Sequence, residues 1–255
     1  MALWARVTHE GRECFGTVDD DTLRLHAGNM LANPRPTGES IPLGAATLLT
    51  PTTPGKMVAL VDNYHALVAK LNHAVPAEPL YFLKANNSFL AGGDTIRAPQ
   101  SYAGKVLYEG ELGVVIGRRC SAVSEADAES CIFGYTCIND VTAIEIITRD
   151  PGFAQWTRAK SFDTFGVFGP VIATGVDPMK LVVKTILNAQ ERLSYPVADI
   201  IFAPARLVSL ISHDITLEAG DVIACGTSIG VGSMRPGSTV SIIIDGIGTL
   251  TNRFD

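Results

Sequence analysis

Short apolar runs separated by turn-forming residues dominate the chain. The clearest are Met57–Val61, Ile132–Ile138 and Val240–Ile244, each rich in β-branched or aromatic side chains. Runs of this length and composition predict β-strands. The 24 glycines and 14 prolines are scattered between the runs rather than gathered in one tract. This distribution favours many short strands joined by turns over a few long helices.

Two segments predict helices instead. Ser124–Asp127 resembles a capping box with Asp in place of Glu or Gln, and it should begin a short helix. Pro204 is suited to the first position of a second helix, in which Leu207, Leu210 and Ile211 share one face. That apolar stripe indicates a helix packed on the core.

The breaker cluster Pro51–Gly55 divides the chain in two. We expect residues 1–55 to form a small β-rich N-terminal lobe and residues 56–255 to form the main domain. With 255 residues, of which 47% are hydrophobic and 18% charged, the chain can bury a sizeable core and is long enough to be an enzyme.

Glu109 and Glu111 lie within Val106–Gly117, whose apolar and β-branched residues predict a strand. Residues two apart in a strand share a face, so the two carboxylates should project side by side. Adjacent carboxylates repel unless water screens them or a cation lies between them. The pair therefore indicates either a solvated strand face or a site for Mg²⁺, Mn²⁺ or Ca²⁺.

Asp140 and Lys160 are further candidates. Asp140 ends the strand-like run that begins at Ile132, where an aspartate can be a turn former or a ligand. Lys160 lies in sequence among Trp156, Phe162 and Phe165. It is either a surface lysine or a partly desolvated functional one.

Two loops complete the set of candidate segments. Asp62–His65 follows the predicted strand Met57–Val61 and precedes a possible short helix, Ala66–Leu71. Gly226–Gly232 is a glycine-rich loop that permits close approach of a ligand to the backbone. It lacks the lysine of a phosphate-binding loop and the glycine order of a dinucleotide site.

Composition excludes several classes of partner. The formal charge is −6 and no basic run occurs, so nucleic acid and anionic membranes are poor partners. No apolar run reaches membrane-spanning length, and no signal pattern begins the chain. The five cysteines are odd in number and widely spaced, which favours free thiols in a reducing compartment. We therefore expect a cytoplasmic protein.

Four groups of residues resemble motifs of one family. They are Tyr108–Gly117; Gly134–Thr136 with Asn139–Asp140; Gln155–Trp156 with Lys160–Phe165 and Gly169–Pro170; and Gly226–Thr227 with Gly230–Gly232. In this order and spacing they are similar to the fumarylacetoacetate hydrolase superfamily, including its isomerase, decarboxylase and acylpyruvase-type members. The resemblance covers the main domain from about residue 56 to 253.

The resemblance implies an α+β, β-rich fold, a mixed β-sandwich roll that is typically a homodimer. It implies that Glu109, Glu111 and Asp140 bind one Mg²⁺ or Mn²⁺ per chain and that Lys160 is the active-site lysine. Three carboxylates leave open coordination positions that a 2-oxo carboxylic acid can fill. The substrate-contacting positions that it implies are Asn63, Tyr64, Gly226 and Thr227.

The chain departs from the family in the segment that covers the site, residues 62–73, which we call the lid segment. In hydrolysing and decarboxylating relatives this segment carries a His and a Glu, at positions that hold Leu67 and Lys70 here. His65 or His73 could substitute, and we take His65 as the candidate catalytic histidine.

The pocket should also be less polar than in relatives that take diacids. An Arg-Asp pair of the family is replaced by Ile144–Glu145, and a Gln by Leu193.

These features lead to three functional hypotheses. A cation and Lys160 suffice to stabilise an enolate, and so support tautomerisation, double-bond migration or decarboxylation of a 2-oxo acid in aromatic-acid catabolism. Hydrolysis of a C–C bond, as in acylpyruvates, also needs a base that activates water, and the altered lid segment removes the usual one. The third hypothesis is a metal-binding protein without catalysis.

Overall fold

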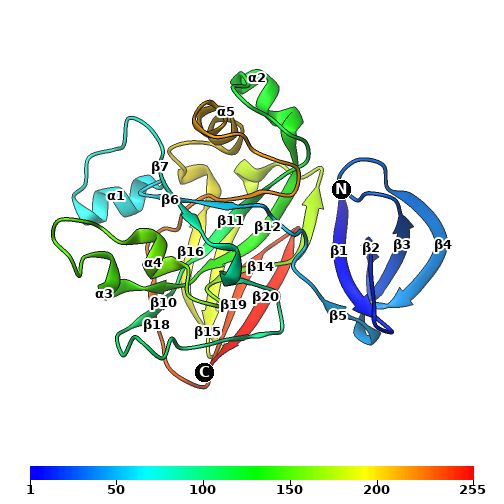
Figure 1. The fold of residues 1–255 in the computed structure, drawn as a ribbon, viewed down its shortest axis with the longest axis horizontal. Coiled ribbons are helices and arrows are strands. Elements are labelled where there is room, and N and C mark those ends of the chain that lie inside the picture. The colour runs from blue at the N-terminus through cyan, green and yellow to red at the C-terminus, as the bar shows by residue number, and fades with distance from the viewer.

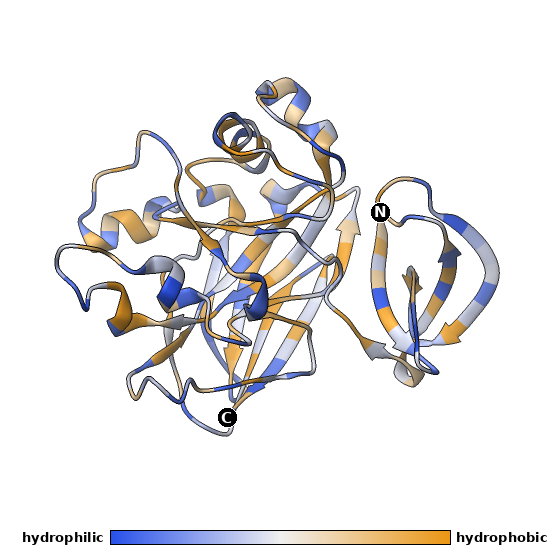
Figure 2. Cartoon of the chain, in the orientation of Figure 1, coloured by the Kyte–Doolittle hydropathy of each residue, from blue (hydrophilic) through white to orange (hydrophobic).

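The computed structural model describes all residues 1–255. Its first five strands form a lobe at one end of the molecule (Figure 1). They are β1 (Ala2–His9), β2 (Arg12–Asp19), β3 (Thr22–Ala27), β4 (Arg35–Pro42) and β5 (Thr47–Leu48). Hydrophilic and hydrophobic positions alternate along β3 (Figure 2), as expected for a strand with one face on a core, whereas β4 is exposed at nearly every position. Glu10 and Gly11 join β1 to β2 with φ of 48° and 75°, the positive values that a tight hairpin requires.

The largest sheet runs through both parts of the chain. Its strand order is β4-β3-β2-β1-β14-β12-β11-β17-β6-β7, with β5 beside β1 and β8 beside β14. The strands beyond the lobe are β6 (Met57–Val61), β7 (Leu80–Lys84), β8 (Phe89–Leu90), β11 (Gly110–Ile116), β12 (Ile132–Asp140), β14 (Gly166–Thr174) and β17 (Val222–Ala224). The lobe joins the main domain where β1 pairs with β14, from Ala2 opposite Thr174 to Trp4 opposite Ile172.

Two smaller sheets complete the architecture. One has five strands: β16 (Gln190–Pro196), β15 (Val182–Leu187), β19 (Ser238–Ile244), β20 (Gly248–Phe254) and β9 (Thr95–Ile96). The other has three: β13 (Thr142–Ala143), β10 (Val106–Tyr108) and β18 (Gly232–Met234). The predicted α+β, β-rich fold class is confirmed.

The helices are short and lie outside the sheets (Figure 1). They are α1 (His65–Leu71), α2 (Glu125–Ala128), α3 (Ile144–Ile147), α4 (Trp156–Lys160) and α5 (Pro204–Asp214). The capping prediction is confirmed, because the Ser124 hydroxyl accepts a hydrogen bond from the Asp127 amide. The Pro204 start is confirmed too, and Leu207 and Ile211 are buried. No helix is long and apolar enough to cross a membrane.

The prediction of one continuous strand over Val106–Gly117 is wrong. The chain changes sheet at Glu109: β10 pairs with β13 and β18, whereas β11 pairs with β12 and β17. The change follows from pairing, because different neighbours compete for the backbone on each side of Glu109. Glu109 therefore lies at the junction of two sheets, where a side chain is less constrained than in a ladder.

Candidate active site

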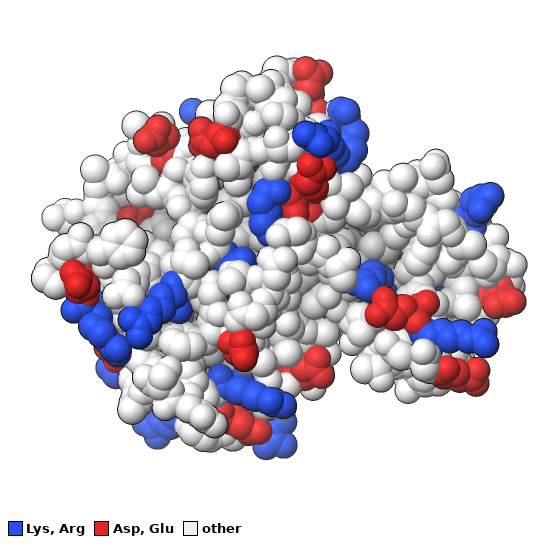
Figure 3. Space-filling model, in the orientation of Figure 1, with Lys and Arg blue, Asp and Glu red and all other residues white.

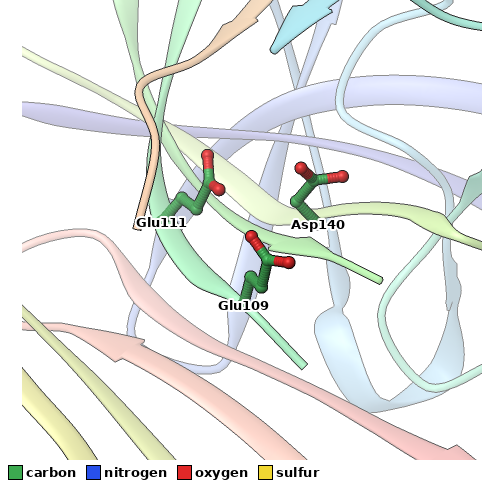
Figure 4. A group of neighbouring side chains, drawn as sticks. All are labelled: Glu109, Glu111 and Asp140. Atoms are coloured by element: carbon green, nitrogen blue, oxygen red, sulfur yellow. The ribbon is translucent and has the colours of Figure 1, made fainter. Parts of the chain in front are cut away.

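Three carboxylates converge between neighbouring strands (Figure 4). Glu109 precedes β11, Glu111 is its second residue and Asp140 ends β12. The amide of Asp140 donates to the carbonyl of Glu109 at 2.9 Å, which fixes the two backbones side by side. One oxygen of each carboxylate lies within 4.8 Å of the others, so the sheet places three oxygen ligands around one point.

The buried environment is costly for three negative charges. Asp140 is fully buried and Glu111 is 1% exposed. Burial, together with the charges of Asp140 and Glu109, raises the pKa of Glu111 well above its usual value. Its Oε2 accepts a hydrogen bond from the Gly226 amide at 2.8 Å, but its buried Oε1 has no partner. An unpartnered oxygen beside two more carboxylates suits a hard divalent cation, so the residues present fit Mg²⁺ or Mn²⁺.

Two buried lysines face Asp140 from different elements. Lys160, at the end of α4, places Nζ 2.6 Å from Asp140 Oδ2 and 2.9 Å from Glu109 Oε2. Lys84, at the end of β7, places Nζ 2.5 Å from Asp140 Oδ1. Burial alone would raise the pKa of Asp140, but the two ammonium groups outweigh it and lower the pKa. In this centre the positive charges of the two lysines therefore offset part of the negative charge of the three carboxylates.

The two lysines differ in their electrostatic surroundings. Burial lowers the pKa of Lys84, and Asp140 only partly opposes this shift. For Lys160, burial acts in the same direction, but Asp140, Glu109 and Glu111 outweigh it and raise the pKa. Lys160 is therefore held as an ammonium among the carboxylates.

Lys84 was missed by the sequence analysis, although the sequence carried a signal. Phe82 and Lys84 are two residues apart on one strand, so both project from the face of β7 that is buried. A lysine on the buried face of an apolar strand needs a carboxylate partner. The surrounding run of leucine and aromatic residues therefore marked Lys84 as a candidate.

The backbone between the two glutamates is held by side chains. Thr227 and Tyr195 donate hydrogen bonds to the carbonyl of Gly110 at 3.1 and 2.9 Å. The hydroxyl of Thr142 donates to Glu109 Oε1 at 2.5 Å. Gly226, with φ of 90°, presents its amide to Glu111. Thr227 and Gly226 thus brace the carboxylates, while their contact with a substrate stays a prediction.

The residues of the lid segment lie in contrasting environments. Asn63 is buried: its amide donates to the Cys225 carbonyl at 2.8 Å and accepts from the Phe202 amide at 2.9 Å. It ties the base of the lid segment to the residue that follows β17 and to the chain before α5. Tyr64 is also buried, with its ring 4.7 Å from that of Tyr195 and its hydroxyl unpartnered.

His65, by contrast, is exposed at the first position of α1. Leu67 is half-buried against the core, and Lys70 is exposed. His73 is more than half exposed and pairs with Asp62, with Nδ1 2.7 Å from Oδ2. The structure therefore gathers Lys160 with the three carboxylates but gives His65 no partner there.

The residues at the substituted positions, Ile144, Glu145 and Leu193, make contacts within the fold. The carboxylate of Glu145 accepts from the Lys105 amide at 3.1 Å, which joins α3 to the chain before β10. Ile144 packs on the hydrophobic core, and Leu193 is buried on β16. None of the three offers a charged group to the carboxylate centre.

Known proteins share both parts of the chain. The profile described as "Fumarylacetoacetate (FAA) hydrolase C-terminal" matches residues 56–255, and the "Rv2993c-like, N-terminal" profile matches residues 3–51. Protein Rv2993c of Mycobacterium tuberculosis is 40% identical over 93% of this chain and 89% of its own. Oxaloacetate tautomerase YisK of Bacillus subtilis is 35% identical over 77% of this chain and 68% of its own.

A solved structure agrees over the whole length. The 2-hydroxyhepta-2,4-diene-1,7-dioate isomerase from Mycobacterium marinum is 37% identical, with a TM-score of 0.91 over 100% of this chain and 98% of its own. The profile match alone covers residues 56–255, including the three carboxylates and both lysines. The chain therefore belongs to the fumarylacetoacetate hydrolase family.

Proposed function

We propose that the protein is an enzyme that tautomerises or isomerises enolisable 2-oxo carboxylic acids with one Mg²⁺ or Mn²⁺ per chain. The observation that carries this proposal is the buried cluster of Glu109, Glu111 and Asp140 with an ammonium group on either side of Asp140. The names of two relatives, an oxaloacetate tautomerase and a dienedioate isomerase, support the same class of reaction.

Glu109, Glu111 and Asp140 would hold the cation through one oxygen each. A divalent cation at this point supplies positive charge that favours the enolate form of a 2-oxo acid over its keto form. Glu109 is the most exposed of the three, with 14% of its side chain accessible, against none for Asp140. A substrate therefore enters on the Glu109 side.

Among the protein's own side chains, Lys160 would stabilise the developing charge and transfer the proton. In tautomerisation, a C–H bond next to the keto carbon breaks and an O–H bond forms, with no net change in oxidation state. The carbon-bound proton would pass to a water molecule, and Lys160 Nζ, held between Asp140 and Glu109, would donate a hydrogen bond and then a proton to the oxygen on which charge develops. Lys160 would regain a proton from that water, so the exchange leaves the enzyme unchanged. Lys84 holds Asp140 from the opposite side and keeps it ionised.

Decarboxylation uses the same enolate and remains within the proposal. C–C hydrolysis is the second candidate, because the lid segment contains a histidine that a carboxylate orients, His73 with Asp62. We also propose that the enzyme acts in the cytoplasm as a homodimer, in aromatic-acid catabolism.

A panel of 2-oxo acids tests the proposal. The metal-loaded protein is incubated with oxaloacetate, an aryl pyruvate and an acylpyruvate, and the enol absorbance and CO₂ release are followed. Metal-dependent keto–enol interconversion, faster than acylpyruvate cleavage, is expected. If the native protein cleaves the acylpyruvate efficiently and His73→Ala does not, the protein is a C–C hydrolase instead. If no acid in the panel reacts, the protein is a metal-binding protein without catalysis.

A further inference from the structure

The two elements that carry the lysines also carry an aromatic wall. Phe82 precedes Lys84 by two residues on β7, and Trp156 precedes Lys160 by four residues on α4. Those spacings put each ring on the same face as its lysine. The lysines converge on Asp140, and the two rings stack on each other with centroids 5.8 Å apart and planes inclined by 19°.

A cavity of about 680 Å³ opens against this wall. Six of its ten lining residues are hydrophobic, among them Tyr81, Phe82, Phe153, Trp156 and Phe162. Its volume falls within the range of roughly 300–1,000 Å³ that is usual for small-molecule sites. The carboxylates do not line it, but Lys160 Nζ lies 5.5 Å from the centre of the Phe82 ring. Phe82 is thus shared by the cavity and the carboxylate centre.

Two features at the rim indicate what the cavity holds. Phe153 is 72% exposed, so its ring contributes little to the folded core and is available to a ligand. Arg158 is the charged residue of the lining, and its guanidinium contacts Gln155 Oε1 at 3.0 Å in an exposed position. A charge held in water binds a carboxylate weakly, so the aromatic rings, rather than Arg158, set the chemistry of the ligand.

We propose that this cavity binds a planar aromatic substituent of the substrate, so that the enzyme acts on aryl-substituted 2-oxo acids such as aryl pyruvates. This inference rests on the proposed function, since the carboxylate and keto oxygens of the substrate bind at Glu109, Glu111 and Asp140. The aryl group then packs against Trp156 and the exposed Phe153, beside Phe82, whose ring is 8% exposed and stacks on Trp156. Offset stacking and loss of water from the ring favour such a ligand over a small diacid, which would leave the aromatic wall hydrated.

Two non-reacting ligands test the subsite directly. N-Phenyloxamate has the shape of an aryl pyruvate, with NH in place of CH₂, and oxamate is the same molecule without the ring. Neither has the carbon-bound hydrogen that enolisation removes. Calorimetric titration of the Mg²⁺-loaded protein should show N-phenyloxamate binding at least about tenfold more tightly than oxamate, the scale expected for aromatic contacts.

Two variants of the wall and one control locate the effect. Phe153→Ser changes an exposed ring and leaves the core intact, and Trp156→Leu keeps an apolar side chain. In each, the ratio of the two affinities should fall to about twofold, on the scale of one lost aromatic contact. Met179→Ser, at an exposed methionine outside the cavity, should keep the native ratio.

Other outcomes overturn one proposal or both. Equal affinities in the native protein, or a preference that persists in both wall variants, refute the aryl subsite while leaving the proposed function intact. Failure of both oxamates to bind in a metal-dependent way refutes the proposed function and the subsite with it. Enol formation from phenylpyruvate and oxaloacetate provides the kinetic check: kcat/KM should be higher for phenylpyruvate.

Discussion

The carboxylate–lysine centre and helix α1 of the lid segment place charged or titratable side chains in opposite environments. Lys84 and Asp140 have no accessible side-chain surface and pair with each other, whereas His65 and Lys70 of the lid segment are exposed. Charges can be buried only where partners compensate them, so the centre constrains the surrounding sheets. Exposed residues on α1 place few constraints on the structure around them. Substitutions on α1 should therefore be tolerated more readily than substitutions in the carboxylate–lysine centre.

The face of the molecule in Figure 3 carries solvated charges, as α1 does. Lysine and arginine are interspersed with aspartate and glutamate on the visible face, without an extended area of one sign (Figure 3). Surface ion pairs of the protein are solvated, as for Lys180 and Asp177, whose side chains are 83% and 49% exposed. Such pairs contribute about 0–1 kcal/mol each to the free energy of unfolding. Substitutions in the buried centre should therefore have larger effects than substitutions on the surface.

Asp140→Asn should have the largest effect. Lys160 would keep Glu109 as a partner, but Lys84 would lose the carboxylate that it contacts. Removing one member of a buried ion pair costs about 3–5 kcal/mol, and we expect that loss in urea unfolding measured with EDTA present. Asp62→Asn is the control: its partner His73 is 51% exposed and Asp62 itself 14%, so solvent screens the pair and the substitution should cost about 1 kcal/mol or less. Equal losses of unfolding free energy in the two variants would show that the buried centre is no more sensitive to charge removal than the lid segment.

Metal removal should have the next largest effect. A cation that binds only the folded state at 100 times its Kd stabilises it by about 2.7 kcal/mol. EDTA should therefore lower the Tm of the native protein, and Mg²⁺ or Mn²⁺ should restore it. Glu111→Gln, which neutralises a buried ligand candidate, should abolish the response. An unchanged Tm together with no metal in elemental analysis would argue against the metal centre.

Lys160→Met tests catalysis at the centre with the lid segment as its control. The variant should still fold and bind metal but lose turnover by about 10²-fold or more, the scale for removing one preorganised electrostatic group. Lys70→Met changes an exposed lysine of α1 and should leave turnover within about twofold, because solvated charges interact weakly. Initial rates of enol formation measure both, and native turnover in Lys160→Met would make Lys160 a structural residue.

The centre was predictable from the sequence where its residues are local, and not where long-range pairing brings them in. Glu109 and Glu111 are two residues apart. The strand pattern alone allows Asp140 to be either a turn former or a ligand, and the family resemblance groups it with the two glutamates. Lys84 meets Asp140 across 56 residues of chain, through the placement of β7 at the edge of the main sheet. The aromatic ring over which Lys160 lies is likewise that of Phe82, not of a residue near it in sequence.

The fold shows the same limit. Strand runs, the α2 cap and the α5 start follow from local patterns and were predicted. The change of sheet at Glu109 and the pairing of β1 with β14 depend on which strands compete for each edge, and hydrophobic periodicity contains no such information.

His65→Ala should have the smallest effect of these substitutions. His65 is exposed and has no hydrogen-bond partner in the structure, so it is not positioned as a base; a positioned general base is worth about 10²–10⁴-fold in rate. We expect enol formation to stay within about twofold of the native rate across the pH range in which histidine titrates. The opposite outcome would be that the native protein cleaves acylpyruvates and that His65→Ala abolishes this cleavage. α1 would then have to move over the carboxylates during turnover. In that case the lid segment, rather than the buried centre, would determine the reaction, and the hydrolase would replace the tautomerase.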